Sequence, residues 1–488
     1  MSEADIIYDV IIVGSGTAMN LVNPLIRQNP AIKIAVIDKD EPGGICLTRG
    51  CIPSKIMLYP AELIRSIERA DELGLELQIR SVSYNKIMNR MRSLIDEEIN
   101  SISEGLSNAE NIDYYHSIAE FISPYTMKVN GKVIKGRMIF LTTGSRAKIP
   151  NIKGLEKTHY YTSDSIIRME MKNLPKSLAI IGGGYIAAEF GHFFSAMGSS
   201  VTILGKNSQF LPDEEPEVSA LAKKELGRYM TIYTGYQVEE VEQLPSGIKR
   251  IKAVSTVSKG TLYVEAEELL LAAGRAPNND ILKPEKGGIE LTKEGWIKVN
   301  EYFETSQPNV WAFGDADGRY LFKHVANYES EVVFYNAVLK RKVKVDYHAI
   351  PHAVFTYPEI ASVGMKEKVA SDHYGSDNIL IGFYRYEDTA KGEAMNVKDY
   401  FVKVIIKRDT MQILGAHIIG PYASILIQEI INLMYTQDRS IFPMQDAIHI
   451  HPSLSEVVQR AFGNLMSSSE YRHMLQHYFE ESGIEIGQ

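Results

Sequence analysis

Short apolar runs followed by glycine recur along the chain and set its predicted organisation. Residues 8–13 form one run, which Gly14-Ser15-Gly16 follows, and residues 32–37 form a second run that ends at Asp38. Strand-length apolar runs separated by a tight turn and a helical stretch are typical of a strand–helix–strand unit. The chain is therefore predicted to begin with one βαβ unit.

The same order returns in the middle of the chain. Residues 177–181 predict a strand, Gly182-Gly183-Gly184 a turn, residues 185–197 a helix and residues 200–204 a further strand. The glycine turns of the two units lie 168 positions apart (182 − 14). We therefore expect two dinucleotide-binding units in one chain.

The remaining segments predict further strands, a long helical stretch and a third unit. Helical spacing runs from Lys55 to about Asn108 and is interrupted near Gly74. Beyond about residue 348, period-two patterns such as 401–406 and 413–419 alternate with helices, which indicates an α+β unit. Three more apolar strands are each expected to end in a glycine, at 138–144, 269–274 and 310–314.

Each Gly-x-Gly turn has a chemical interpretation as well as a structural one. Such a turn lets the backbone approach a pyrophosphate, which then lies at the positive end of the following helix. Asp38 comes 22 residues after Gly16 (38 − 16), where a carboxylate can accept hydrogen bonds from a ribose. Met19 stands where glycine or alanine is usual, so we expect looser packing there. The alternative is that both turns only reverse the chain.

The second turn differs from the first at two positions. Ala187 is small, which suits close packing of the helix on the strand. The second strand of this unit ends at Gly205-Lys206, without a carboxylate that would repel a 2′-phosphate. Lys206 therefore favours NADP slightly over NAD, although it is also interpretable as a solvated surface lysine.

Length and charge narrow the class of protein. A chain of 488 residues has room for roughly three domains. Its formal net charge of −9 gives no positive field for phosphates, so we expect no nucleic-acid partner. We find neither a secretory signal nor an apolar run long enough to span a membrane, and therefore expect a cytoplasmic protein.

The chain has two cysteines, Cys46 and Cys51, within the segment GGICLTRGCIPSK. A close pair in a cytosolic chain indicates catalysis or metal binding, but a zinc site needs more soft ligands than this segment offers. We therefore expect no metal. Five extended steps span about 16 Å and five helical steps about 7.5 Å, so a disulfide requires a folded-back loop. Pro53 suits the first turn of a helix, which places Cys51 where the helix dipole favours a thiolate.

The cysteine segment is very similar to the redox-active segment of the class I pyridine nucleotide-disulfide oxidoreductases. Motifs along nearly the whole chain share this resemblance: TTGS at 142–145, GGGYIAAE at 182–189, AAGRAPN at 272–278, FGDA at 313–316, FTYPEIASVG at 355–364 and HIHPSLSE at 449–456. The resemblance implies two Rossmann-like domains, for FAD and NAD(P), and a C-terminal α+β dimerisation domain. The corresponding ranges are 1–150 and 279–348 for FAD, 151–278 for NAD(P) and 349–488 for the interface.

The resemblance also implies a role for individual residues. Cys46 matches the thiol that meets substrate, Cys51 the thiol against the flavin, and Lys55 and Glu189 an ion pair beside the flavin's reactive nitrogen. Asp38 and Asp315 match residues that hold the FAD ribose and ribityl chain, and Gly182, Gly184 and Ala187 the nicotinamide-nucleotide fingerprint. The remaining residues expected at the cofactor sites are Gly14, Gly16, Lys39, Gly44, Thr143, Gly144, Gly314, Lys206, Gly274 and Arg275.

The segment around His451 has both a structural and a catalytic interpretation. Ser453 to Glu456 predict a capping box before an amphipathic helix, which leaves His451 as a loop residue. In the family that the chain resembles, the histidine before this proline is the base and the following glutamate is its partner. That resemblance assigns these roles to His451 and Glu456. It also implies a homodimer, in which the histidine reaches the cysteines of the other subunit.

The resemblance leaves the substrate open. CIPSK and HPSLSE are most similar to dihydrolipoyl dehydrogenases, which predicts a dithiol substrate that is a small molecule or is carried on a lipoyl domain. HVANYE at 324–329 and YEDTAKGEAM at 386–395 are closer to mycothione reductases, which with Lys206 keeps an NADPH-dependent reductase of a small mycothione- or glutathione-type disulfide as an alternative. A redox-sensing flavoprotein without turnover is a third possibility, which an intact His451–Glu456 relay argues against.

Overall fold

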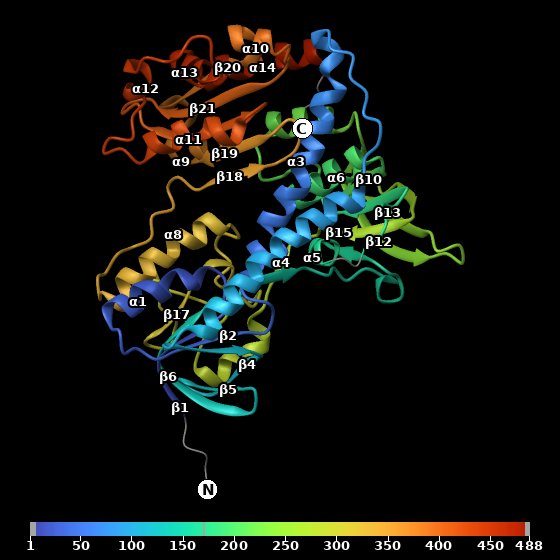
Figure 1. The fold of residues 1–488 in the computed structure, drawn as a ribbon. Helices are drawn as coiled ribbons and strands as arrows, with labels where there is room; N and C mark the ends of the chain where they lie inside the picture. Colours follow the sequence, from blue (N-terminus) through green and yellow to red (C-terminus); the bar gives the residue numbers. More distant parts are fainter. Residues whose placement is uncertain (1–5, 169–170, 484–488) are drawn as a thin grey trace.

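The first apolar runs lie in the middle of a seven-stranded sheet in the computed structural model, which describes residues 6–168 and 171–483. Its parallel strands run in the order β3 (Ile112–His116), β2 (Ile34–Asp38), β1 (Ile6–Val13), β6 (Lys132–Leu141) and β17 (Val310–Ala312). An antiparallel extension comprises β5 (Thr126–Val129) and β4 (Ala119–Ser123). Because β17 pairs with β6, a late segment of the chain completes the first unit (Figure 1).

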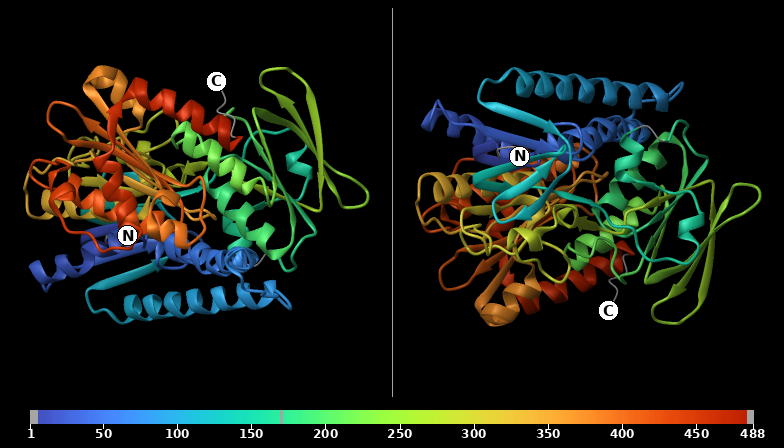
Figure 2. Two further views of the ribbon diagram at one scale, coloured as in Figure 1. Left: turned by 90° about the horizontal axis from the view of Figure 1, so that it is seen from above. Right: turned by 90° about the horizontal axis from the view of Figure 1, so that it is seen from below.

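The second unit has a five-stranded parallel sheet and an antiparallel flap. The sheet order is β11 (Thr231–Thr234), β10 (Ser200–Gly205), β9 (Ser177–Ile181), β15 (Glu268–Leu271) and β8 (Tyr161–Thr162). The predicted strand 177–181 and helix 185–197 are confirmed as β9 and α6 (Tyr185–Met197). The flap projects from the side of the molecule and consists of β12 (Tyr236–Gln243), β13 (Lys249–Ser255) and β14 (Thr261–Ala266) (Figure 2).

The third unit has a six-stranded antiparallel sheet at the C-terminal end of the chain. Its strands, in order, are β18 (Pro351–Val354), β19 (Ile360–Gly364), β22 (Ile413–Ile419), β21 (Phe401–Lys407), β20 (Ile379–Arg385) and β23 (Leu465–Ser467). The polar positions in the predicted strands do not mark a solvent face, since Lys403 and His417 are both buried. These side chains are buried among charged and polar partners, which compensates for their removal from water. Together the three units confirm the predicted α/β class with an α+β third unit.

Helices connect the units and cover the sheets. The predicted break near Gly74 is present, because α3 (Cys51–Glu68) and α4 (Tyr84–Asn108) are separated by the 3-10 turn Ala70–Leu73. Another 3-10 turn, Thr17–Leu21, follows the first glycine turn and contains Met19, so a regular helix begins only at α1 (Val22–Gln28). The other helices include α2 (Gly44–Thr48), α5 (Ser163–Ile167), α7 (Pro216–Leu226), α8 (Lys323–Val333), α9 (Glu367–Tyr374), α11 (Ala423–Met434), α13 (Ser455–Gly463) and α14 (Ser468–Ser482).

One hydrophobic core joins the third unit to the centre of the molecule. It includes side chains of α3, α4 and α6 together with most of the antiparallel sheet. The cysteine-bearing end of α3 is therefore fixed by packing against both neighbouring units. Across residues 6–168 and 171–483, none of the helices combines the length and the apolar character that crossing a membrane requires.

Candidate active site

The two cysteines form a disulfide in a folded-back loop. Cys46 lies in the short helix α2 and Cys51 is the first residue of α3, with 4.8 Å between their Cα atoms. This separation lies within the range that a disulfide can bridge. A Cβ at Gly50 would approach the carbonyl oxygen of Ile45 to 2.7 Å, so glycine is required for the chain to turn this closely. The glycine-permitted loop thus brings two cysteines five positions apart into bonding range.

Cys46 and Cys51 lie in the wall between two cavities. One cavity is lined by the first glycine turn and by the acids that follow the strands, and contains Gly14, Gly16, Asp38, Lys39, Gly44, Thr143, Gly144, Gly314 and Asp315. The other has a volume of about 1020 Å³ and is lined by Lys55, Glu189 and Arg275 among others. Because both cysteines line both cavities, the disulfide lies where the two cavities adjoin.

The first cavity fits the nucleotide part of FAD. Gly14 has φ +103°, and a Cβ there would lie 2.2 Å from the carbonyl oxygen of Thr142, so only glycine leaves this cradle open. Asp38 is oriented at the end of β2 by hydrogen bonds from the backbone N–H (2.7 Å) and the hydroxyl (2.6 Å) of Ser15. A glycine cradle beside a fixed carboxylate is the donor and acceptor set that a pyrophosphate and a ribose require.

The opposite wall of this cavity carries Asp315. Its carboxylate accepts a 2.5 Å hydrogen bond from the Ser145 hydroxyl, and burial raises the pKa of Asp315 above its ordinary value. The neighbouring Gly314 donates its N–H to Glu329 at 2.6 Å. Thr143 donates its hydroxyl to Asn279 at 2.5 Å. These bonds fix the loops on which the predicted FAD residues of this side lie.

The ion pair between Lys55 and Glu189 joins α3 to α6. Lys55 Nζ lies 2.9 Å from each oxygen of Glu189, and the Glu189 carboxylate also accepts the N–H of Phe355 at 3.1 Å. Glu189 is only 5% exposed, so the bound ammonium compensates for a buried charge. The Lys55 ammonium also lies 4.4 Å from the centre of the Phe355 ring. The structure thus brings together Lys55, Glu189 and both cysteines around one cavity.

The second glycine turn lies outside the two cavities described above. Gly182 has φ +142°, and a Cβ there would lie 2.1 Å from the carbonyl oxygen of Ala272, so glycine is again required. Gly184 precedes α6, Ala187 is fully buried inside it, and Lys206 is exposed after β10. Near the end of β15, Gly274 accepts the N–H of Lys148 at 2.9 Å. Its neighbour Arg275 reaches the cysteine cavity, where it donates to the Ser145 hydroxyl at 3.1 Å.

His451 and Glu456 contact each other but not the cysteines of the same chain. His451 Nδ1 lies 3.0 and 3.1 Å from the two Glu456 oxygens, and the hydrogen bond with His451 holds the pKa of Glu456 below its ordinary value. The His451 side chain is 67% exposed and lines neither cavity. The predicted capping box is wrong in one half: Glu456 accepts the N–H of Ser453, but the Ser453 hydroxyl donates to the carbonyl of Ile450 instead of accepting from the helix.

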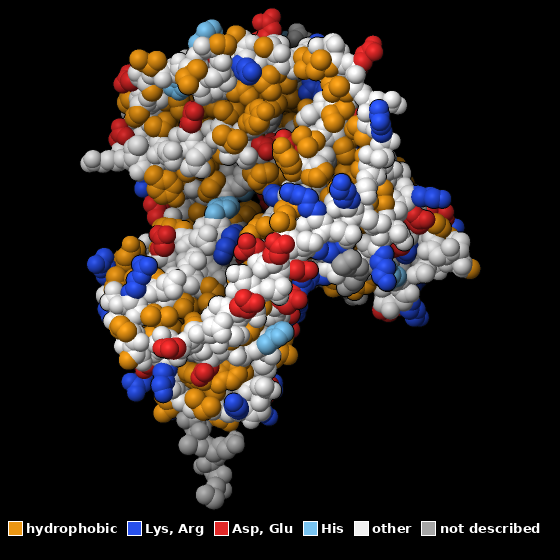
Figure 3. Space-filling model, viewed as in Figure 1, with side chains coloured by type: hydrophobic (Ala, Val, Ile, Leu, Met, Phe, Trp, Pro, Cys, Tyr) orange, Lys and Arg blue, Asp and Glu red, His pale blue; other side chains and the backbone are white. Residues whose placement is uncertain are grey.

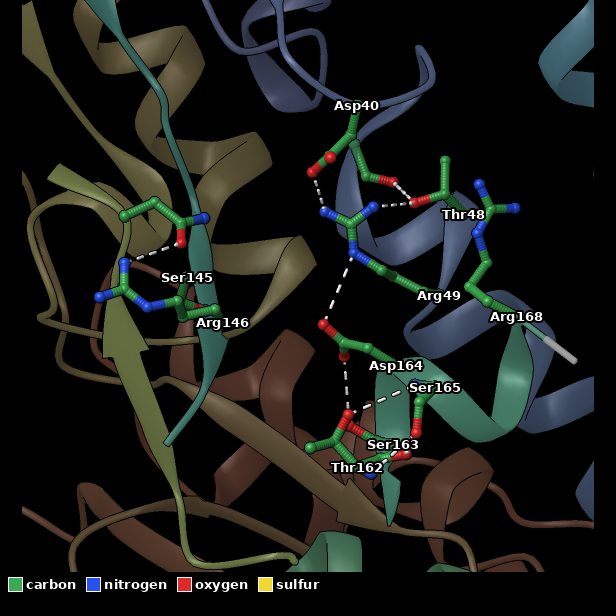
Figure 4. A network of polar contacts seen from close by, with 12 residues as sticks. Asp40, Thr48, Arg49, Ser145, Arg146, Thr162, Ser163, Asp164, Ser165 and Arg168 are labelled. Carbon is green, nitrogen blue, oxygen red and sulfur yellow. Dashed lines mark hydrogen bonds and ion pairs between the residues drawn. The ribbon is translucent and has the colours of Figure 1, made fainter. Parts of the chain in front are cut away.

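Four cavity residues were not predicted from the sequence. Arg49, between the cysteines, contacts Asp40 and Asp164 (Figure 4). Lys323 lines both cavities, where its ammonium donates to the Thr17 hydroxyl at 2.9 Å and burial lowers its pKa. Tyr185 and His352 line the larger cavity. Arg49 could have been noticed from its place between the cysteines and Tyr185 from its place in GGGYIAAE, whereas Lys323 and His352 carry no local signal.

The described part of the chain contains no cluster of side chains that is suited to bind a metal ion. Within residues 6–168 and 171–483, no three His, Cys, Asp or Glu side chains are grouped so that they could hold an ion.

Comparisons with known proteins agree with this geometry. The model of the family described as pyridine nucleotide-disulphide oxidoreductase matches residues 8–330, and the model of that family's dimerisation domain matches residues 350–462. A dihydrolipoyl dehydrogenase of Chlamydia trachomatis is 30% identical over 465 residues, which cover 94% of this chain and 96% of the relative. A mycothione reductase of Mycobacterium tuberculosis is 32% identical over 466 residues, which cover 93% of this chain and 98% of the relative.

A solved structure has the same fold. The HOCl-induced flavoprotein disulfide reductase RclA from Escherichia coli superposes with a TM-score of 0.81 at 27% identity, covering 93% of this chain and 99% of that one. The similarity in fold therefore extends over most of the chain.

Proposed function

The chain belongs to the pyridine nucleotide-disulphide oxidoreductase family, and from this premise we propose that it oxidises a dihydrolipoyl-type dithiol. The family uses FAD and NAD(P), so the protein is a flavoprotein with a disulfide redox centre. The single observation that carries the proposal is the disulfide that faces both cavities. A disulfide where the two cavities adjoin can exchange with a substrate and also contact a flavin.

In the proposed reaction, Cys46 exchanges with the substrate and Cys51 lies against the flavin. A substrate thiolate attacks the Cys46 sulfur, a mixed disulfide forms, and the Cys46–Cys51 bond breaks with release of the Cys51 thiolate. The second substrate thiol then displaces Cys46, so the substrate leaves as a disulfide and the protein keeps two electrons and two thiols. FAD and the nicotinamide supply, when bound, the two-electron acceptor that restores the disulfide.

The position of Cys51 favours its thiolate. It is the first residue of the 18-residue helix α3, where the backbone dipole stabilises negative charge. Lys55, one turn further along α3, adds a positive charge that Glu189 orients. We propose that this pair keeps Cys51 in the thiolate form while Cys46 is engaged with substrate.

The proposed base for the substrate thiol is His451, with Glu456 orienting its ring. Since His451 lies outside the cysteine cavity of its own chain, we propose that a second copy supplies it. Hydrophobic side chains gather on the face of the molecule shown in Figure 3. Those exposed on α3, at and just before the start of α11, and in the loop before His451 are Ile52, Tyr59, Leu63, Tyr422, Ile425, Ile448 and Ile450. A homodimer that covers this surface is consistent with the dimerisation domain of the family.

The wall of the larger cavity supports a substrate with a hydrocarbon chain. Five of the ten side chains that α3 and α11 contribute to it are aliphatic or aromatic, namely Ile52, Ile56, Tyr59, Ile427 and Ile431. These five side chains can contact the alkyl chain of a dithiol.

An NADPH-dependent reductase of a small disulfide is the second candidate. Lys206 leaves the end of β10 without a carboxylate, and the mycothione reductase similarity is as extensive as that to dihydrolipoyl dehydrogenase. In this case the same relay runs in the opposite direction.

A substrate panel separates the two candidates. Purified dimer is assayed with dihydrolipoamide and each oxidised nicotinamide, then with lipoamide, glutathione disulfide and mycothione and each reduced nicotinamide. We expect the highest kcat/KM for dihydrolipoamide. Turnover confined to NADPH and a small polar disulfide would contradict the first candidate and support the second.

A further inference from the structure

The side chain between the two cysteines joins the redox loop to carboxylates of both nucleotide-binding units. Arg49 donates through Nη2 to Oδ2 of Asp40, which follows β2, and its Nε lies 3.6 Å from Oδ2 of Asp164 in α5 (Figure 4). The Arg49 side chain is only 17% exposed. The charge carried by the loop is therefore held in a fixed and partly desolvated position.

The backbone that carries Asp164 is fixed by its own helix start. Asp164 lies in the first turn of α5, whose start is fixed by a reciprocal capping box between Thr162 and Ser165. The Ser163 hydroxyl donates to Asp164 Oδ1 at 3.3 Å, as Figure 4 shows. A capped turn that is anchored in this way positions the carboxylate before any ligand is present.

A second arginine extends this network to the flavin side. Arg275 Nη1 lies 3.5 Å from Asp164 Oδ1, while Arg275 Nε donates to the Ser145 hydroxyl at 3.1 Å. That hydroxyl in turn donates to Asp315. Asp164 thus lies between the arginine of the redox loop and the arginine that contacts the Asp315 wall of the nucleotide cavity.

We propose that Asp164 is a positioning residue that acts through Arg49 to lower the tendency of the Cys46–Cys51 disulfide to be reduced. The inference rests on the proposed redox role of the two cysteines. Reduction consumes two electrons and two protons and breaks one S–S bond, and a dithiol reagent that supplies them becomes a disulfide. When the Cys51 proton leaves, the reduced loop carries a negative charge that the oxidised loop does not have.

The charges next to the cysteine loop therefore shift its dithiol–disulfide equilibrium, and the sign of each charge predicts the direction of the shift. The guanidinium of Arg49 favours the reduced, partly anionic loop, and Asp164 opposes it by neutralising that guanidinium. Removing the Asp164 charge should favour the dithiol, whereas removing the Arg49 charge should favour the disulfide. If the Arg49–Asp164 contact only held the loop in place, both substitutions would shift the equilibrium in the same direction, because each of them breaks the same contact.

The test measures the dithiol–disulfide equilibrium of the holoenzyme by thiol trapping. Protein is equilibrated anaerobically with defined ratios of reduced and oxidised dithiothreitol at low salt, alkylated, and weighed by mass spectrometry. The readout needs no substrate turnover, and the chain has two cysteines in all, so each added label reports this pair. Bound flavin is measured by absorbance for each variant.

We expect Asp164→Asn to shift the midpoint ratio roughly threefold to tenfold toward the dithiol and Arg49→Leu by a similar factor toward the disulfide. A tenfold shift corresponds to about 30 mV for a two-electron couple. Arg49→Lys keeps the charge and should stay close to the wild type. Asp280→Asn is the matched control, since Asp280 is also paired with an arginine, Arg146 at 2.8 Å, but that arginine lies outside the cysteine loop.

The outcomes distinguish this inference from the proposed function. If the wild-type pair never gains labels in reducing buffer, the proposed redox role itself fails. If the wild type titrates but Asp164→Asn and Arg49→Leu shift in the same direction, or match Asp280→Asn, the charge-based role of Asp164 is wrong. A loss of flavin in Asp164→Asn leaves Arg49→Leu and Arg49→Lys to decide between charge and contact.

Discussion

The proposed site has two parts: a sulfur half, which consists of Cys46, Cys51, Lys55 and Glu189, and a proton half, which consists of His451 and Glu456. The sulfur half is complete within one chain, whereas the proton half is separated from the cysteines of its own chain. Cys46, Cys51, Lys55 and Glu189 come from α2, α3 and α6 and line one cavity together. His451 is bonded to Glu456, yet it is two-thirds exposed and lines no part of that cavity. The first group is fixed by a core shared between units, and the second lies on a surface rich in exposed apolar side chains.

This difference indicates which contacts fold with the chain and which need assembly. The sulfur half should form in any folded monomer that binds flavin, because its elements pack in the chain's own interior. The proton half should act only where a second copy brings His451 to the cysteines. Three substitutions, taken in order of decreasing effect, can test that separation.

Loss of the exchanging sulfur should have the largest effect. Cys46→Ser removes the atom with which the substrate forms a mixed disulfide, and a hydroxyl cannot replace it in thiol exchange. We expect kcat/KM for dihydrolipoamide to fall by at least roughly 10⁴-fold. Flavin absorbance should be retained, because the first cavity keeps its glycine cradle and Asp38. Residual turnover within tenfold of wild type would show that Cys46 is not the exchanging thiol.

Removing the proposed base should cause a large loss of activity, and a second chain that carries the base should restore part of that activity. We expect His451→Ala to lower kcat/KM by roughly 10²- to 10⁴-fold, the usual contribution of a positioned base. Co-expression of His451→Ala with Cys46→Ser, using two affinity tags, yields mixed dimers. If His451 acts across the interface, one of the two sites is intact and about half of the wild-type activity returns.

The mixed dimer gives the opposite result if the histidine acts within its own chain. Each site would then carry one defect, and activity would stay as low as in the single variants. Dimers of Cys46→Ser with wild type are the matched control, since they retain one intact site under either arrangement. The comparison therefore tests the separation of the two halves directly.

The sequence predicted the cysteine pair better than its surroundings because the signal of the pair is local. Five positions between two cysteines, glycines beside them and a proline at the next helix are all visible along the chain. The two glycine turns are likewise local, and the backbone requires glycine at Gly14 and Gly182. Strand and helix bounds such as those of β9 and α6 followed from the same kind of periodic pattern.

Long-range pairs were harder to predict because nothing in a segment indicates its partner. Asp164 lies 115 positions from Arg49 (164 − 49), and its role depends on a fold that places α5 against the redox loop. Lys403 appeared to be a polar position in an alternating strand, but it is buried between Glu215, Glu217 and Glu367. Tertiary charge pairing thus overrides the usual meaning of a polar residue in a period-two pattern.

The smallest of the three effects should come from the partner of the base. Glu456→Gln keeps the size of the side chain but removes the charge that orients the His451 ring. We expect a fall of about tenfold in kcat, with KM for dihydrolipoamide nearly unchanged. Since the hydrogen bond from His451 lowers the pKa of Glu456, this contribution should be present above the ordinary glutamate pKa and be lost as the pH falls through the lowered value. The ratio of wild-type to variant kcat should therefore be largest near neutral pH and approach one in acid. A constant ratio across that range would mean that Glu456 only supports the start of α13, and the proton half would then reduce to His451 alone.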